Sequence, residues 1–180
     1  MKNKKSSIVK ICHLILLFVG AGICIYGCTL NESSVFDITS LVIKIFALVS
    51  SFVYLIKGYK KDADKYYKVF MWILGISEVI GFASLLNKGI QLPFNQAIIA
   101  VLKFAAFVLI IGANDYGKLK SNIISIALIV FTGYAEICLM VSSELATHRA
   151  IFSLSQFIFA LIVAIMVFEK YSDKESRGAK

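Results

Sequence analysis

Four ionisable residues interrupt long apolar runs of the sequence: Lys44, Glu78, Lys103 and Glu136. Each stands near the middle of a run that is long enough to cross a lipid bilayer. A charge in the hydrocarbon layer is costly unless it faces a partner or water, so such charges mark paired or functional positions. Two lysines and two glutamates on four different segments therefore predict one shared charged network.

Three kinds of chemistry are open to such a network. It could hold a small polar or charged solute for binding or transport, which is the interpretation we favour. It could instead consist of structural salt bridges in an accessory or scaffold subunit. The last alternative is an intramembrane enzyme that acts on lipid headgroups with Glu78 or Glu136 as base. The sequence contains no H-E-x-x-H, G-x-S-x-G or nucleotide-binding glycine motif, so a non-enzyme is the more economical reading.

The segments that carry these residues belong to a membrane protein. Of the 180 residues, 59% are hydrophobic and 17% charged, with one proline and a mean hydropathy of +0.82, which is too apolar for a soluble domain. About 20 helical residues span a bilayer, and continuous rather than alternating apolar runs favour helices over barrel strands. We predict an all-α polytopic membrane protein, a single transmembrane domain over 1–180, with helices at about 11–30, 36–56, 69–86, 94–111, 123–141 and 150–168 and a cytoplasmic tail at 169–180.

Basic residues predict the orientation of these six helices. Fifteen Lys and Arg residues fall on the side of the two termini, and only Lys88 and Arg149 fall on the other, so both termini should be cytoplasmic. This bias accounts for the net charge of +8 without a nucleic-acid partner, and 17 Lys against 2 Arg favours a bacterial cell membrane. Aromatic residues near the second basic loop are predicted to lie in the headgroup layer: Tyr59, Tyr66, Tyr67, Phe70 and Trp72.

An internal repeat relates two pairs of predicted helices. The residues VIK that end at Lys44 match the residues VLK that end at Lys103. The residues GISE that end at Glu78 likewise match the residues GYAE that end at Glu136. The lysine and glutamate of a pair are separated by 34 residues in the first case and 33 in the second. A shift of two helices predicts parallel two-helix repeats, and Gln156 takes the lysine position in a degenerate third unit.

The polar residues of these helices are predicted to share one depth. At 1.5 Å per residue they lie about 9 to 16 Å below the outer surface. Pairs within each hairpin are expected, Lys44 with Glu78 and Lys103 with Glu136, although a cyclic arrangement of the helices could exchange the partners. Hydroxyl groups are expected nearby, from Ser51, Ser77, Thr132, Ser153 and Ser155. Because these groups exceed what helix register requires, we predict an outward-open pocket. Its candidate ligand-binding residues are Lys44, Glu78, Lys103, Glu136 and Gln156.

Cysteine and histidine residues do not form a metal-binding pattern, and no metal, cofactor or catalytic residue is predicted. Gly20, Cys24 and Cys28 recur at intervals of four, a small-residue stripe typical of contact with another helix or a second copy of the chain. His13, near the inner boundary, is predicted to be interfacial. Cys28 also follows an apolar run with the outline of a lipoprotein signal, but an uncleaved first span is favoured. The remaining predicted partner is the lipid bilayer itself.

Overall fold

A computed structural model describes residues 2–30, 35–87 and 147–178, together with positions 98, 101–102, 105–106, 123, 126–127, 130–131, 133–135 and 138. All regular elements in these residues are helical, which confirms the predicted all-α class. The long helices are α1 (Lys2–Cys28), α2 (Val35–Ile56), α3 (Asp64–Asn87) and α6 (Thr147–Gly178), and a short 3-10 helix, η1 (Lys61–Ala63), precedes α3.

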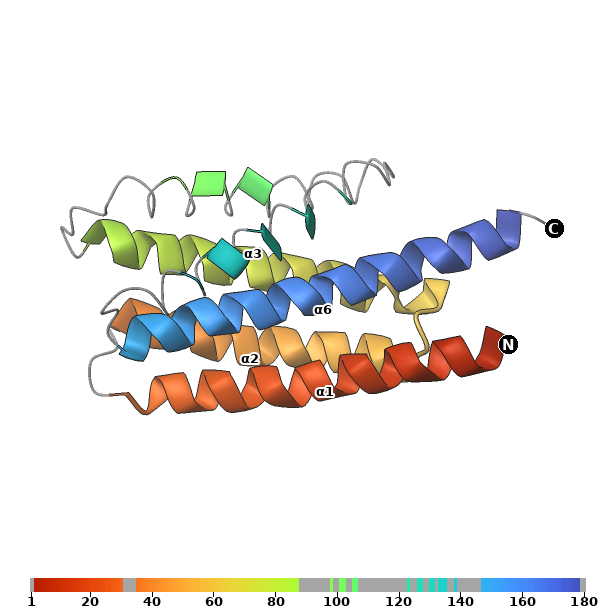
Figure 1. Cartoon of the computed structure of the whole chain (residues 1–180), viewed down its shortest axis with the longest axis horizontal. Helices are drawn as coiled ribbons and strands as arrows, with labels where there is room; N and C mark the ends of the chain where they lie inside the picture. The colour runs from red at the N-terminus through yellow and green to blue at the C-terminus, as the bar shows by residue number, and fades with distance from the viewer. Residues whose placement is uncertain are drawn as a thin grey trace.

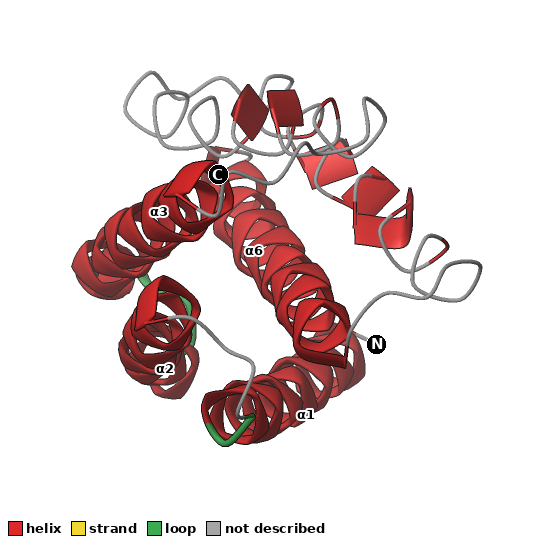
Figure 2. Ribbon diagram, turned by 90° about the vertical axis from the view of Figure 1, so that its left-hand side faces the viewer, coloured by secondary structure: helices red, strands yellow, loops and turns green. Residues whose placement is uncertain are grey.

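The four long helices lie side by side as an antiparallel bundle (Figure 1). The chain reverses from α1 to α2 and again from α2 to α3, and the two ends of the chain lie at the same end of the bundle (Figure 1). Seen end-on, α2 lies between α1 and α3, and α6 packs against α1 (Figure 2). Stacked Phe70 and Phe159 rings, with centroids 6.5 Å apart, also join α3 to α6. The core of the described bundle therefore lies between all four helices.

Three of these helices are long and apolar enough to cross a membrane: Ser7–Cys28, Val35–Ile56 and Ala150–Lys170. They correspond to the first, second and sixth predicted spans. The third predicted span, 69–86, lies within α3, whereas most of 94–111 and 123–141 falls outside the described residues. α1 begins well before residue 11 and α6 continues beyond residue 168, because polar residues extend both helices where hydropathy alone would end them.

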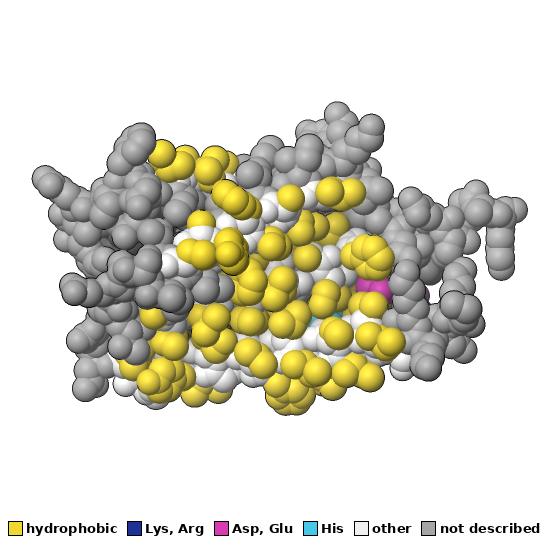
Figure 3. All heavy atoms as spheres, in the orientation of Figure 1, with side chains coloured by type: hydrophobic (Ala, Val, Ile, Leu, Met, Phe, Trp, Pro, Cys, Tyr) yellow, Lys and Arg dark blue, Asp and Glu magenta, His cyan; other side chains and the backbone are white. Residues whose placement is uncertain are grey.

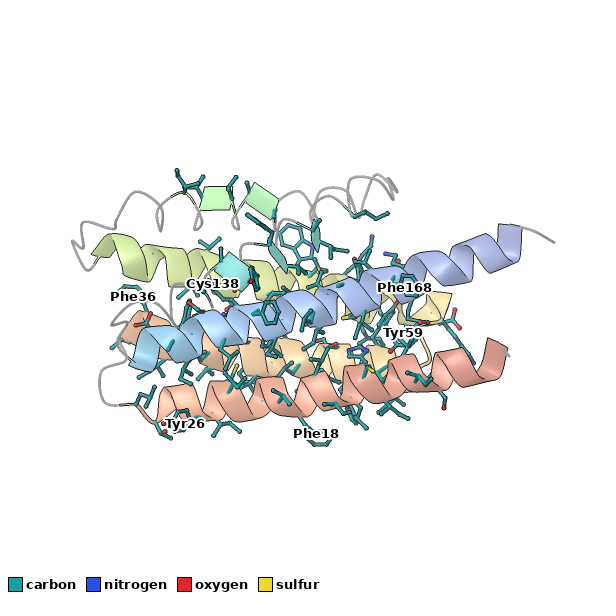
Figure 4. The ribbon with its side chains drawn as sticks, in the orientation of Figure 1. Phe18, Tyr26, Phe36, Tyr59, Cys138 and Phe168 are labelled. Atoms are coloured by element: carbon teal, nitrogen blue, oxygen red, sulfur yellow. The ribbon has the colours of Figure 1, made fainter. Side chains whose placement is uncertain are left out.

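The outward faces of the described helices are apolar. Phe18 on α1 is 71% exposed and Phe46 on α2 is 62% exposed. Hydrophobic side chains cover much of the described surface in Figure 3, and Phe18 points away from the bundle in Figure 4. A large continuous apolar surface is unfavourable in water. It suits a helical bundle that is surrounded by lipid.

A left-handed turn formed by Gly58 and Tyr59 ends α2. Their φ angles are 68° and 58°. The Gly58 N–H donates to the Leu55 carbonyl at 2.9 Å and the Tyr59 N–H to the Tyr54 carbonyl at 3.3 Å, which satisfies carbonyl groups at the helix end. Glycine adopts this conformation readily, but a tyrosine does so at a cost of roughly 1 to 2 kcal/mol. Tertiary contacts must therefore hold Tyr59 in place.

Candidate functional site

The buried stripe of α2 carries Lys44 into the interior. Residues three and four positions apart share one face of a helix, and the buried positions of α2 follow this spacing: Ser40, Leu41, Lys44, Ala47, Leu48, Ser51, Tyr54 and Leu55. Lys44 is fully buried among them. Its position on the interior face therefore follows from the helical period of its apolar neighbours.

The Lys44 ammonium group joins three helices. Its Nζ lies 3.1 Å from Glu78 Oε1 on α3 and donates a hydrogen bond to Ser155 Oγ on α6 at 3.3 Å. The face of the Phe152 ring, also on α6, lies 4.4 Å from Nζ. The predicted pairing of Lys44 with Glu78 is thus confirmed, and Lys44 has a carboxylate, a hydroxyl and an aromatic face around it.

Gln156 completes this arrangement from α6. Its Nε2 donates to Glu78 Oε2 at 2.6 Å, and the two residues are 7% and 5% exposed. We call Lys44, Glu78 and Gln156 the ion-pair triad. The two carboxylate oxygens of Glu78 have different partners. Oε2 accepts a hydrogen bond from Gln156, whereas Oε1 lies 3.1 Å from Lys44 Nζ without hydrogen-bonding geometry. Oε1 is thus held by charge alone among the described residues.

Close packing between α2, α3 and α6 surrounds the ion-pair triad. Ser40 and Ser77 hydroxyl oxygens lie 2.9 Å apart, and each hydroxyl donates within 3.0 Å to the backbone carbonyl of the other residue. A Cβ atom on Gly81 would lie only 2.7 Å from Phe152 Cζ, so glycine at this position allows the Phe152 ring to approach. The Ser77 hydroxyl therefore joins α3 to α2. The sequence predicts a position beside a pocket instead.

The remaining predicted site residues are not brought together with the ion-pair triad in the described part of the chain. Lys103 and Glu136 lie outside the described residues, as does Thr132. Ser51 is buried, but it belongs to a different polar cluster. Three of the five predicted ligand-binding residues, Lys44, Glu78 and Gln156, therefore form one contiguous group.

The second polar cluster is built around His13. His13 was predicted to be interfacial, and its side chain is fully buried in the bundle. Its Nδ1 lies 2.8 Å from the Tyr59 hydroxyl and its Nε2 lies 2.8 Å from Ser51 Oγ. Ser51 Oγ in turn donates to Met166 Sδ on α6 at 3.2 Å. Figure 4 shows Tyr59 toward the end of the bundle at which both chain ends lie.

A helical period in α1 could have identified His13 as an interior residue. Its buried positions recur at intervals of three and four residues: His13, Leu17, Gly20, Cys24 and Gly27. The predicted small-residue stripe shares Gly20 and Cys24 with these positions but does not include His13. A Cβ on Gly20 would lie 3.4 Å from Ile158 Cγ2 and 3.6 Å from Leu48 Cδ2. Packing against α6 and α2 thus accounts for the glycine at position 20.

The aromatic residues that were predicted to lie in the headgroup layer differ in burial within the bundle. Tyr59, Tyr67 and Phe70 are buried in the bundle, whereas Trp72 is 59% exposed. Tyr67 and Phe70 share the buried face of α3 with Leu74, whereas Tyr59 lies in the turn after α2. Hydropathy cannot show whether an aromatic side chain near the basic loop points into the bundle or away from it, because side chains of either kind have the same residue types and the same neighbouring lysines.

A second ion pair fastens the start of α3 to the far end of α6. Lys170 Nζ lies 2.9 Å from Asp64 Oδ1 and 4.1 Å from the centroid of the Tyr67 ring. Lys170 is only 7% exposed although Asp64 is 38% exposed. Lys170 falls in the predicted cytoplasmic tail, so this part of the tail packs against the bundle.

Comparisons with protein-family models, with curated proteins and with solved structures find no match to this chain. Its function must therefore be inferred from its own residues. No group of three or more His, Cys, Asp or Glu side chains in the described part of the chain could hold a metal ion.

Proposed function

We propose that this chain is a non-catalytic integral membrane protein, an accessory or scaffold subunit, in which the ion-pair triad locks three helices together. The observation that carries this proposal is the set of contacts made by Lys44. Its ammonium group meets Glu78 at 3.1 Å, Ser155 at 3.3 Å and the Phe152 ring at 4.4 Å while fully buried. The groups that contact the ammonium group thus all belong to the protein itself.

The contacts of the ion-pair triad favour a structural role. A buried charge that loses its partner is strongly unfavourable, so the two ions hold α2 and α3 at one relative height. Gln156 extends the same constraint to α6 through Glu78. Two charges and one amide therefore fix three helices, with the opposite charges of Lys44 and Glu78 cancelling each other.

Binding or transport of a small polar or charged solute is the second candidate. One observation favours it: Glu78 Oε1 is buried and accepts no hydrogen bond among the described residues. A buried carboxylate oxygen in that condition can accept a hydrogen bond from water or from a guest. The second Lys and Glu pair of the sequence repeat, Lys103 and Glu136, would enlarge the same layer if the two-helix units are parallel repeats.

Thiol labelling at Ser155 tests the two candidates against each other. In a cysteine-free background, we expect Ser155→Cys to resist a small water-soluble maleimide, because Ser155 is fully buried beside Lys44. Thr29→Cys, at an exposed position after α1, is the matched control and should react completely. Rapid labelling of Ser155→Cys from outside the cell would contradict the structural lock and support a solute pocket.

For the membrane topology we propose six spans, cytoplasmic termini and parallel two-helix repeats. Support comes from the excess of basic residues on the side of the termini. The placement of both chain ends at one end of the bundle also supports it (Figure 1). The exposed lysines of the α2–α3 turn, Lys57 and Lys60, lie on the same predicted side.

A pair of single cysteines checks this topology. In intact cells that express a cysteine-free chain, Thr29→Cys should react with an impermeant maleimide, whereas Lys60→Cys should react only after the membrane is permeabilised. Both positions are exposed in the structure, so accessibility to water is the only expected difference. The reverse pattern would invert the topology, and reaction of both residues from one side would remove the second span.

A further inference from the structure

The cluster around His13 is a directed chain of hydrogen bonds. Met166 Sδ has no hydrogen to give, so Ser51 donates its only hydroxyl hydrogen to this sulfur. Ser51 Oγ must then accept from His13 Nε2–H across 2.8 Å. His13 Nδ1 is left without a hydrogen and accepts the hydroxyl hydrogen of Tyr59 at 2.8 Å. For a neutral imidazole, this chain of hydrogen bonds therefore places the hydrogen on Nε2.

Tyr59 supports this direction because its hydroxyl keeps its hydrogen. Burial and the nearby Glu169 carboxylate raise the pKa of the Tyr59 phenol above its ordinary value of 10.0. The phenol is therefore protonated throughout the physiological range and can donate to Nδ1. Its ring stacks on the imidazole at 5.8 Å and meets the Tyr54 ring edge-on at 5.2 Å.

The contact between Tyr59 and His13 also stabilises an unfavourable backbone conformation at Tyr59. Tyr59 has a φ of 58°, which is rare for a residue with a side chain. A strained turn persists only where surrounding contacts over-determine it, and such turns are common at switch regions. The hydrogen bond and the stack with His13 are the contacts that bind the turn to α1.

The charged groups around His13 do not offer it a counter-ion in the described contacts. The titratable groups of the surrounding elements are Tyr54, Tyr59, Asp64, Tyr67, Glu169 and Lys170. Asp64 is already paired with Lys170, and the field of Glu169 acts on the Tyr59 phenol. Lys10 on α1 and the turn residues Lys57 and Lys60 are exposed and basic. A proton added to His13 would therefore add a further positive charge to this region.

We infer that His13 and Tyr59 form a pH-sensitive latch between α1 and the α2–α3 turn, closed when His13 is neutral and released when it binds a proton. A proton on Nδ1 removes the acceptor for the Tyr59 hydroxyl hydrogen, which must then turn away from His13. It also buries a cation without a carboxylate partner in the described contacts. Tyr59 then leaves the left-handed conformation, and the turn separates from α1.

The sign of the pH dependence follows from this mechanism. In the closed latch Nδ1 accepts the Tyr59 hydrogen and has no proton, whereas the released imidazole can bind a proton with the ordinary histidine pKa of about 6.5. Release therefore increases as the pH falls below about 6.5. For one proton the ratio of open to closed turn changes by at most about tenfold per pH unit.

Nitrogen NMR of labelled histidine tests the tautomer directly. The chain has two histidines, so His148→Gln leaves His13 as the single signal. In lipid nanodiscs at pH 7.5 we expect the neutral form with its hydrogen on Nε2, and the cationic form should appear as the pH is lowered. A cationic imidazole or a hydrogen on Nδ1 at pH 7.5 would overturn the latch.

Hydrogen exchange of the turn tests the mechanical consequence. After correction for the intrinsic rate, amide exchange in residues 57–60 should rise by up to about tenfold per pH unit below about pH 6. Tyr59→Phe removes only the donor hydroxyl and should raise exchange already at pH 7.5. His13→Asn retains a donor and an acceptor but does not titrate, so the pH dependence should vanish. An unchanged pH dependence in His13→Asn, or none in the wild-type protein, would contradict the proposal.

Discussion

Replacing Lys44 by methionine should destabilise the folded protein by about 3 to 5 kcal/mol, because it leaves the Glu78 carboxylate buried without its cation. Methionine matches the length of the lysine stem and packs well in apolar surroundings, so loss of volume contributes little. The hydrogen bond from Gln156 to Glu78 Oε2 remains, but it cannot neutralise the charge. The measurement is reversible unfolding in mixed micelles.

A double-mutant cycle separates the ion pair from its surroundings. Lys44→Met combined with Glu78→Gln should cost clearly less than the sum of the two single changes, because no unpaired charge remains. Lys60→Met is the control, since Lys60 is an exposed lysine of the α2–α3 turn and its replacement should leave stability nearly unchanged. Additive losses in the cycle would show that Lys44 and Glu78 do not stabilise each other.

Adding one methyl group to Gly27 should destabilise the protein by about 1 to 3 kcal/mol through overpacking. A Cβ atom at Gly27 would lie 2.6 Å from Leu41 Cδ1 and 3.1 Å from Ile151 Cγ2. Leu41 is itself 2% exposed and has little room to move. Gly27→Ala should therefore push α1 away from both α2 and α6, and it should lower the melting temperature in detergent.

Gly22 provides the matched control on the same helix. Apart from its chain neighbours and the nearby backbone of α1, no heavy atom of the described residues lies within 4 Å of a Cβ built at this position. Gly22→Ala should leave the melting temperature unchanged or raise it slightly, because alanine favours a helix over glycine by about 0.5 to 1 kcal/mol. Equal losses for the two substitutions would mean that the close approach at Gly27 is not what limits α1.

Sequence alone predicted the pairing of Lys44 with Glu78 because a lysine and a glutamate inside apolar runs must meet partners. Gln156 was selected differently, because it takes the lysine position of the degenerate third repeat. Ser155 was among the hydroxyl groups expected nearby, but the sequence could not show that it would bind Lys44 or that the Phe152 ring would face the ammonium group. Those contacts depend on the rotation and height of α6, which no local pattern encodes.

His13 and Tyr59 show the opposite case. The position of His13 near the end of an apolar run suggested an interface, whereas its spacing from Leu17 and Gly20 places it inside the bundle. The left-handed turn at Tyr59 has no sequence signal, because turn preferences assign positive φ to glycine. Its origin is tertiary, in the contacts with His13 and Tyr54.

The two polar clusters divide the bundle into parts that differ in mobility. α2 and α6 are linked at two heights, by Lys44 with Ser155 and by Ser51 with Met166. Two separated links prevent both sliding and rotation, so α2 and α6 should move as one rigid body. His13 on α1 is hydrogen-bonded to this body through Ser51. If that hydrogen bond is lost, we expect α1 to move against α2 and α6, which stay linked to each other.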